Sequence, residues 1–399
     1  MMPPVDQSLV LVKHAFLACL ASHVPWLPAW CIDCLSGLIN IGAVLAVFLT
    51  LFALISVMER KILARIQNRY GPNRVGPFGL LQPVADGIKM LIKEDVVPRN
   101  ADKLVHYLAP LAMLTPAILA LCVIPYGRGM TPVSIDGGIL FFFAIGSATE
   151  LAVFMAGWAS NNKYSMLGAM RAIAQMVSYE LPLVMAAVPV VMIAGSLSPD
   201  VIVEAQGKYL FHTVPQWFVL TPWGAATFLL FFTAGLVESN RTPFDMPEGE
   251  SEIVAGHMTE YSGFKYALFF MAEYFGMFAV SGLAVTLFLG GWNAPAAWLQ
   301  FIPSWIWFFA KLSVLLFVFI WIRGTLPRMR IDHVMSFAWK FMLPMAFVCI
   351  PAAALWHYAG RGPAGWLLSL LLIAAAGAGL RKITGIGEKF APRTYRFAE

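Results

Sequence analysis

The segment from Glu238 to Gly263 reads ESNRTPFDMPEGESEIVAGHMTEYSG and holds six carboxylates between two strongly apolar stretches. A carboxyl group that is removed from water or crowded by other acids has its pKa raised, so that it can exchange protons near neutral pH. A solvated acidic loop is the simpler explanation. It is disfavoured because apolar side chains interleave with the acids, namely Phe244, Met246, Ile253 and Val254. The segment is therefore a candidate site of proton exchange.

Spacing within this segment adds two expectations. Asp245, Glu248 and Glu252 recur at i, i+3 and i+7, so they would share one face if the segment were helical. Arg241 follows Glu238 by three residues and could pair with one acid, which would lower the pKa of that acid while the others stay raised. Crowded acids of this kind titrate as a coupled set.

Further acids lie inside apolar stretches of the chain. Glu150, Glu180 and Glu273 would each cost roughly 2.5–3.5 kcal/mol to insert at the centre of a bilayer. Such residues are functional-site candidates by default, and a proton relay is the expected role of Glu180 and Glu273, whereas for Glu150 the alternative that follows is favoured. The alternative is a neutral, hydrogen-bonded acid in a helix interface. Lys311, also within an apolar stretch, is a weaker candidate.

The elements that must position these acids are membrane-spanning helices. The 399 residues are 59% hydrophobic and 12% charged, whereas a soluble domain averages about 25% charged residues. Apolar runs of about 20 residues span a bilayer as helices, which satisfy their own backbone hydrogen bonds. The sequence predicts an all-α, polytopic transmembrane protein with eight to nine spans. The nine apolar stretches are Leu35–Val57, Tyr107–Ile124, Gly138–Trp158, Met170–Ala194, Thr221–Val237, Tyr266–Leu289, Ile306–Ile322, Phe337–Trp356 and Gly365–Leu380.

The distribution of Lys and Arg predicts the orientation of these spans. With nine spans and an outside N-terminus, 22 of the 27 Lys and Arg residues lie inside, and the four outside are Lys13, Arg128, Lys208 and Arg361. The basic C-terminal tail is then inside. Ser8–Leu20 is too short to span comfortably, and we expect an interfacial helix there rather than a signal peptide.

A long inside segment follows the first span. Its helix-breaking residues predict a shaped loop, and they are Gly71, Pro72, Gly76, Pro77 and Gly79. An amphipathic helix is expected next, with one face made of Leu81, Val84, Ile88, Leu91 and Ile92 and another made of Asp86, Lys89 and Lys93. This helix would either anchor the chain at the membrane surface or hold open a slot at lipid level, flanked by Glu59 and Arg60.

Motifs for bound cofactors are sparse. Cys31 and Cys34 form one C-x-x-C pair, but a tetrahedral or cluster site needs about four ligands. The seven histidines form no haem-like pair on two helices, and the sequence contains no G-x-x-x-x-G-K-[ST] motif. We expect the chain to carry no cofactor or metal of its own. The pI near 8.9 reflects topology signals beside anionic lipid rather than nucleic-acid binding.

Four blocks of the sequence resemble the signature segments of one family, the quinone-site membrane subunits of respiratory complex I. The blocks read MERKILARIQNRYGPNRVGPFGLLQPVADGIK, GWASNNKYSMLGAMRAIAQMVSYELPL, ESNRTPFDMPEGESEIVAGHMTEYSG and WIRGTLPRMRIDHVMSFAWKFMLP. The resemblance covers about residues 35–358 and implies an eight-helix quinone-site and proton-relay domain there. Residues 1–34 would form an N-terminal interfacial or periplasmic segment, and residues 359–399 an extra span with a basic tail.

The resemblance also implies an activity, partners and a location. Quinone would be the substrate, and its reduction would drive proton translocation. NAD, FMN and iron–sulfur clusters would lie in partner subunits. The partners would be soluble quinone-site and iron–sulfur subunits, small membrane subunits and antiporter-like subunits. The protein would lie in a bacterial inner membrane, with its N-terminus in the periplasm and its C-terminus in the cytoplasm.

Several alternatives to this function remain open. Equivalent subunits occur in membrane-bound hydrogenases and F420H2 dehydrogenases, which use another electron donor. A stand-alone ion transporter would explain the intramembrane acids but would leave the shaped loop and the amphipathic helix unused. A structural anchor for soluble redox subunits would leave the buried acids unexplained.

Carried over residue by residue, the resemblance implies two sets of site residues and no catalytic or metal-binding residue on this chain. The quinone-binding set is Glu59, Arg60, Arg69, Asp86, Lys89, Phe270, Tyr274 and Arg323. The proton-relay set is Glu180, Glu238, Arg241, Asp245, Glu248, Glu250, Glu252, Glu260 and Glu273. Arg323 could instead extend from the end of its span to the interface, and Phe270 could be a packing residue. His257 stands where the family usually has an aromatic residue, in AGFHTEYSG.

Overall fold

The computed structural model describes residues 10–13, 15, 29–210, 214–246, 249, 254–360 and 362–384. Within these residues, eight helices are long and apolar enough to cross a membrane. A ninth apolar helix, α9 (Pro222–Glu238), is shorter, with 17 residues. The prediction of an all-α protein with eight to nine spans is confirmed.

The helices follow the predicted apolar stretches but often extend past them. In chain order they are α2 (Ala29–Ile66), α3 (Gln82–Ile92), α4 (Lys103–Cys122), α5 (Gly138–Gly146), α6 (Ala148–Ala159), α7 (Lys163–Ala194), α8 (Pro199–Ala205), α9 (Pro222–Glu238), α11 (Gly263–Phe288), α12 (Ser304–Thr325), α13 (Ile331–Phe337), α14 (Leu343–Tyr358) and α15 (Pro363–Thr384). Shorter elements are η1 (Pro77–Gly79), the antiparallel pair β1 (Tyr209–Leu210) and β2 (Val214–Pro215), η2 (Phe218–Leu220), η3 (Gly256–Met258), η4 (Ala297–Leu299) and the π-helical turn η5 (Ala338–Met342).

Helix α11 forms the centre of the bundle. In its most apolar stretch 78% of the residues are buried, against 11% for α15 at the periphery. It packs against α4, α9 and α12. Large aromatic side chains on α11, including Phe275, Phe278 and Phe288, are fully buried in the main hydrophobic core. Residues carried by α11 are therefore held on a rigid support.

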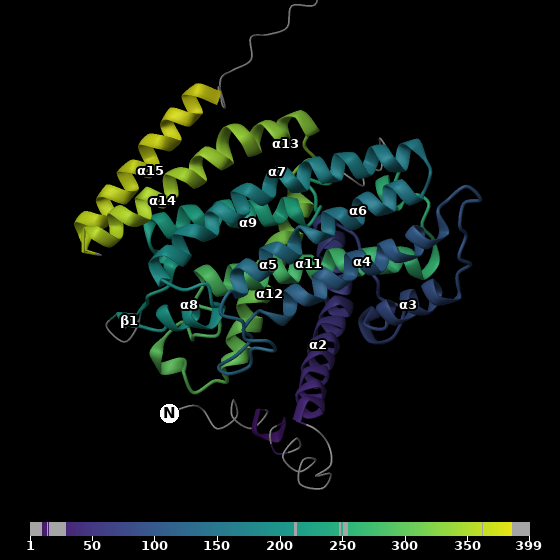
Figure 1. The fold of residues 1–399 in the computed structure, drawn as a ribbon, viewed down its shortest axis with the longest axis horizontal. Helices are drawn as coiled ribbons and strands as arrows, with labels where there is room; N and C mark the ends of the chain where they lie inside the picture. Colours follow the sequence, from purple (N-terminus) through teal and green to yellow (C-terminus); the bar gives the residue numbers. More distant parts are fainter. Residues whose placement is uncertain are drawn as a thin grey trace, which may run out of the picture.

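Figure 1 shows how the helices are arranged. Helices α4, α7, α9 and α11 run roughly side by side across the view, and α2 crosses their direction steeply. Helix α3 lies at one end of this bundle, and α8 and β1 lie at the other end. Helix α15 lies along α14 and also contacts α9. The two ends of the bundle thus carry different sets of loops.

Local side-chain contacts fix several helix ends. Asp102 caps α4, Asn162 caps α7 and Thr221 caps α9, each accepting a hydrogen bond from a backbone N–H of the first turn. Lys311 on α12 donates to three backbone carbonyls just past the end of α11 at 2.7–2.8 Å. Because an ammonium group has three donors, these bonds use all of them. Lys311 therefore has a capping role at α11.

The predicted amphipathic helix is confirmed as α3. Its apolar side chains, including Val84, Ile88 and Leu91, are exposed on the chain, while Asp86 is half-buried. Helix α3 packs against α2 and α11. The helix therefore presents an apolar face that suits the membrane interface or a neighbouring subunit.

The N-terminal expectations are tested only in part. Most of Ser8–Leu20 lies outside the described residues. Helix α2 begins at Ala29, before the predicted start at Leu35, so Cys31 and Cys34 belong to the helix and both are free thiols. Helix α2 also continues past Val57 to Ile66, which places Glu59 and Arg60 within the helix rather than at its end.

Candidate functional site

The first candidate site is the Glu59 cluster, which consists of Glu59 on α2, Arg241 after α9, Tyr274 on α11 and Arg323 on α12. The Tyr274 hydroxyl donates to Glu59 Oε2 at 2.6 Å. Arg241 Nη1 donates to Glu59 Oε1 at 3.1 Å, and Arg323 Nη1 donates to the same oxygen. The Glu59 side chain is buried. A buried carboxylate is tolerated here because two guanidinium groups and a hydroxyl compensate it.

Arg241 connects this cluster to the acidic segment. Its guanidinium lies over the Tyr274 ring, 4.1 Å from the centroid, a favourable cation–π contact. Burial by itself would lower the pKa of Arg241. The attraction of Tyr274, Glu59 and Glu273 outweighs this effect, so the pKa lies above its usual value. The spacing in the sequence suggested that Arg241 could pair with one acid. Its guanidinium does form an ion pair with an acid, Glu59, which lies 182 residues earlier in the chain.

A second group of charges joins α2 to α3. Arg60 Nη1 lies 2.8 Å from Asp86 Oδ2, and Lys89 Nζ lies 3.4 Å from Asp86 Oδ1. Partial burial raises the pKa of Asp86, but the attraction of Arg60, with smaller contributions from Gln82 and Lys89, outweighs it and holds the pKa below its usual value. Asp86 thus links α3 to α2 through a largely exposed ion pair.

The remaining members of the predicted quinone-binding set are Arg69 and Phe270, which make other contacts. Arg69, in the loop after α2, donates from Nε to Gln67 Oε1 at 2.7 Å. Phe270 packs against Tyr266 with ring centroids 4.9 Å apart. Arg323, for which extension to the interface was the alternative, binds buried Glu59 through its guanidinium and keeps 36% of its side chain exposed.

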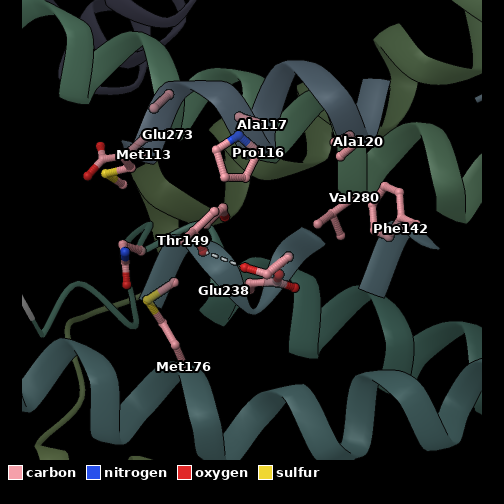
Figure 2. Close-up of a pocket in the computed structure, with 16 residues that line it drawn as sticks. Met113, Pro116, Ala117, Ala120, Phe142, Thr149, Met176, Glu238, Glu273 and Val280 are labelled. Carbon is pink, nitrogen blue, oxygen red and sulfur yellow. Dashed lines mark hydrogen bonds between the residues drawn. The ribbon is translucent and has the colours of Figure 1, made fainter. Parts of the chain in front are cut away.

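The second candidate site is the carboxyl cavity, a hollow of about 60 Å³ inside the bundle. Glu238, at the end of α9, and Glu273, on α11, both line it, together with Thr149, Ser239 and Asn240. Figure 2 shows the two glutamates entering the cavity from different elements. A space of this size with several polar partners can hold a few ordered water molecules. The cavity can therefore connect two carboxyl groups on separate helices.

A further pair of acids lies next to the carboxyl cavity. Glu238 interacts electrostatically with Glu180 on α7 and with Glu150 on α6. Glu180 accepts a hydrogen bond from Ser147, at the break between α5 and α6. Glu150 was not in the predicted relay set, although its position in an apolar stretch was a usable signal. The structure groups it with Glu180 and Glu238.

The acidic segment after Arg241 is described only in part. Asp245 is half-buried between buried Phe244 and Met246. Glu248, Glu250 and Glu252, with their predicted helical spacing, lie outside the described residues. Glu260 accepts a hydrogen bond from Asn162 Nδ2 at 2.6 Å, so this acid fastens the segment to the start of α7.

His257 lies in the same segment, in the turn η3. Its ring is fully buried and contacts Phe269 edge to face, with centroids 5.6 Å apart. Burial lowers the pKa of His257 to about 4. The side chain is therefore neutral at physiological pH and fills the place of an aromatic ring.

Comparison with known proteins gives consistent matches. The family described as NADH dehydrogenase matches residues 39–354 of this chain. The chain is 51% identical over 300 residues to the H subunit of NADH-quinone oxidoreductase from Dehalococcoides mccartyi (strain CBDB1), covering 74% of this chain and 81% of the relative. It is 44% identical over 339 residues to the protein of the same name from Paraburkholderia xenovorans (strain LB400), covering 84% and 93%. A relative of that name from Carboxydothermus hydrogenoformans is 48% identical over 315 residues, covering 78% and 87%.

Proposed function

Because the chain belongs to the NADH dehydrogenase family and is a membrane subunit of NADH-quinone oxidoreductase, we propose that it forms much of the quinone access channel and binding chamber and couples quinone reduction to proton translocation. The Glu59 cluster and the Arg60–Asp86 pair would line the chamber. The carboxyl cavity would carry protons. The resemblance seen in the four sequence blocks is confirmed by the family match.

The coupling between quinone reduction and proton translocation is inferred from the position of residues 238–241. Glu238 lines the carboxyl cavity, and three residues later Arg241 binds Glu59. Gln175 on α7 anchors this short segment by donating to the carbonyls of Val237 and Phe244 at 3.0 and 2.9 Å. A change of charge beside Glu59 therefore acts on the same segment that holds Glu238.

Helix α11 provides a second link between the two sites. Glu273 lines the carboxyl cavity, while the next residue, Tyr274, donates its hydroxyl to Glu59. Tyr274 also packs against Phe52 with ring centroids 5.0 Å apart. A quinone headgroup that approached the Glu59 cluster would meet a phenol and two guanidinium groups, which donate hydrogen bonds to carbonyl oxygens.

The proton path from the cavity is proposed to run sideways through the bundle. Glu180 and Glu150 follow Glu238 in that direction, and Glu150 is half-buried next to exposed Leu151 on α6. Straight across the bundle, α11 continues from the cavity into a buried run that ends at Phe288 and is apolar apart from Ser281 and Thr286. Protons would therefore leave at the α6 surface toward an antiporter-like membrane subunit.

Electrons for the quinone are proposed to come from partner subunits. NAD, FMN and iron–sulfur clusters would be bound there, with soluble quinone-site and iron–sulfur subunits seated over α3 and the acidic segment. Small membrane subunits would cover other faces. The residues of this chain would then position the headgroup and supply protons, so that catalysis is shared.

The proposed location is the bacterial inner membrane, with the α3 end of the bundle facing the cytoplasm. The charge distribution in the sequence supports this orientation. Residues 35–358 would act as the quinone-site domain. Helix α14 ends at Tyr358 and α15 begins at Pro363, which is consistent with a separate extra span after that domain.

Two variants of the complete complex test the function. Glu238→Gln keeps the shape of the side chain but removes its exchangeable proton. In proteoliposomes we expect proton pumping and NADH:quinone turnover to fall together, with little change in the KM for quinone. Tyr274→Phe removes one hydrogen bond to a charged group, and we expect the KM for quinone to rise about tenfold.

Glu94→Gln provides the matched control, because Glu94 is exposed in the loop after α3. Its turnover and pumping should match those of the unmodified complex. Each variant must first be shown to assemble on a native gel. An assembled Glu238→Gln complex that pumped protons at the normal ratio would overturn the relay.

A further inference from the structure

A polar cavity lies at the end of the bundle opposite α3, and the proposed function does not use it. Its volume is about 350 Å³. It is lined by the end of α8 and the following turn, by the loop between α11 and α12, by the first turn of α12 and by Arg128. Figure 1 places α8 and β1 far from α3. We propose that this cavity binds the phosphodiester headgroup of a membrane phospholipid.

The charges around the cavity suit a singly charged anion. Arg128 and Lys208 line it from two different loops, and Glu204 at the end of α8 is the one acid among the described residues of the lining. The net charge of these three groups is that of one cation, which a single phosphodiester neutralises. The guanidinium of Arg128 can bind two phosphate oxygens at once. Glu204 disfavours a doubly charged free phosphate and suits a headgroup that carries an ammonium.

The start of α12 brings the positive end of a helix dipole to the same cavity. This helix has 22 residues and begins at Ser304 without a side-chain cap, because Pro303 occupies the capping position. The first backbone N–H groups of a helix have no intrahelical acceptor, and they carry the positive end of the helix dipole. Ser304 Oγ accepts a hydrogen bond from the Arg128 backbone N–H at 3.0 Å. This bond holds the Arg128 loop beside the helix start, where an anion binds favourably.

An indole group provides an independent sign of a missing acceptor. Trp307 lines the cavity, and its Nε1 is buried without a hydrogen-bond partner among the described residues. An indole N–H is a donor only, and leaving it unpaired away from water is unfavourable. A phosphate oxygen that reached this N–H from the cavity would satisfy it.

The surroundings of the cavity favour a lipid over a free anion. The loop between α11 and α12, which lines the cavity through Gln300 and Ile302, also carries Trp298 and Phe301 with exposed fractions of 69% and 72%. Exposed aromatic side chains at the ends of spanning helices typically lie at the level of the lipid headgroups. The same loop can therefore contact acyl chains while the cavity holds the phosphate.

Photocrosslinking tests this site in the complete complex. The complex is reconstituted in nanodiscs that contain phosphatidylethanolamine with a diazirine near its headgroup, and crosslinked peptides are mapped by mass spectrometry. We expect crosslinks in residues 204–209 and 292–307. In the double variant Arg128→Gln/Lys208→Gln these crosslinks should fall about 30-fold, since each cation near a lipid surface contributes roughly a fivefold gain in binding.

Three controls keep the outcome decisive. Lys13→Gln removes a cation expected on the same side of the membrane and should leave the crosslinks unchanged. Trp307→Phe keeps an aromatic side chain, although a smaller one, and removes the N–H, and it should lower the crosslinks about tenfold even if the double variant fails to assemble. Inorganic phosphate at millimolar concentration should not compete. Unchanged crosslinks in Trp307→Phe and in the assembled double variant would overturn the lipid site, as would full competition by phosphate. NADH:quinone turnover should stay normal in these variants.

Discussion

Removal of Arg241 should loosen the acidic segment far more than removal of Arg60. Arg241→Gln and Arg60→Gln delete the same charge and leave the same amide, but the two ion pairs differ in burial. The side chains of Arg241 and Glu59 are 9% and 6% exposed. Those of Arg60 and Asp86 are 51% and 26% exposed. The pair of variants therefore compares a buried charge within this segment with an exposed charge outside it.

The expected magnitudes follow from this difference. Breaking a buried ion pair by removing one partner costs about 3–5 kcal/mol, because the other charge stays buried. Glu59 would keep Arg323 and Tyr274, so that we expect the lower end, about 3 kcal/mol. An exposed pair such as Arg60–Asp86 contributes only about 0–1 kcal/mol.

Hydrogen exchange of the complete complex measures this effect locally. When opening is fast and reversible, the exchange rate of a peptide reports its opening free energy. A loss of about 3 kcal/mol should raise the exchange rate of peptides covering residues 239–246 by about 100-fold in Arg241→Gln. In Arg60→Gln the same peptides should change less than about fivefold. Equal exchange in both variants would refute the claim that Arg241 fastens this segment to Glu59.

Three other predictions address separate parts of the molecule. Gly168→Ala would place a Cβ 2.5 Å from the Cα of Gly256, so the complex should lose about 1–3 kcal/mol of stability, whereas Gly87→Ala, with open space around it, should keep its Tm. Because burial lowers the pKa of His257 from 6.5 to about 4, the free energy of unfolding should fall as the pH drops through this window, and His257→Phe should remove about 1 kcal/mol of that loss at pH 5.5, seen as a flatter plot of Tm against pH. A cysteine at Gly207 should react with an impermeant thiol reagent from outside the cell, and labelling from the cytoplasmic side alone would contradict the orientation.

The sequence by itself determined the helices and the family. Apolar runs of sufficient length must form helices in lipid, because the backbone can satisfy its hydrogen bonds there in no other open-chain form. The amphipathic spacing from Leu81 to Ile92 likewise predicted α3. These features are local, so a single stretch of residues carries the full signal. The four signature blocks also identified the family without any structure, and the family match agrees with them.

Only the tertiary structure decided which charged groups meet. Glu59 and Arg241 are 182 residues apart, and no spacing rule connects them, because their contact depends on how α2, α9 and α11 pack. Local spacing indicated only that Arg241 could pair with one acid, without identifying which one. Glu150 shows the same limit, since its apolar surroundings marked it as unusual, but only the packing of α7 against both α6 and α9 placed it with Glu180 and Glu238. Helix periodicity is set within a few residues, whereas burial and pairing of charge are set by neighbours that are distant in the chain.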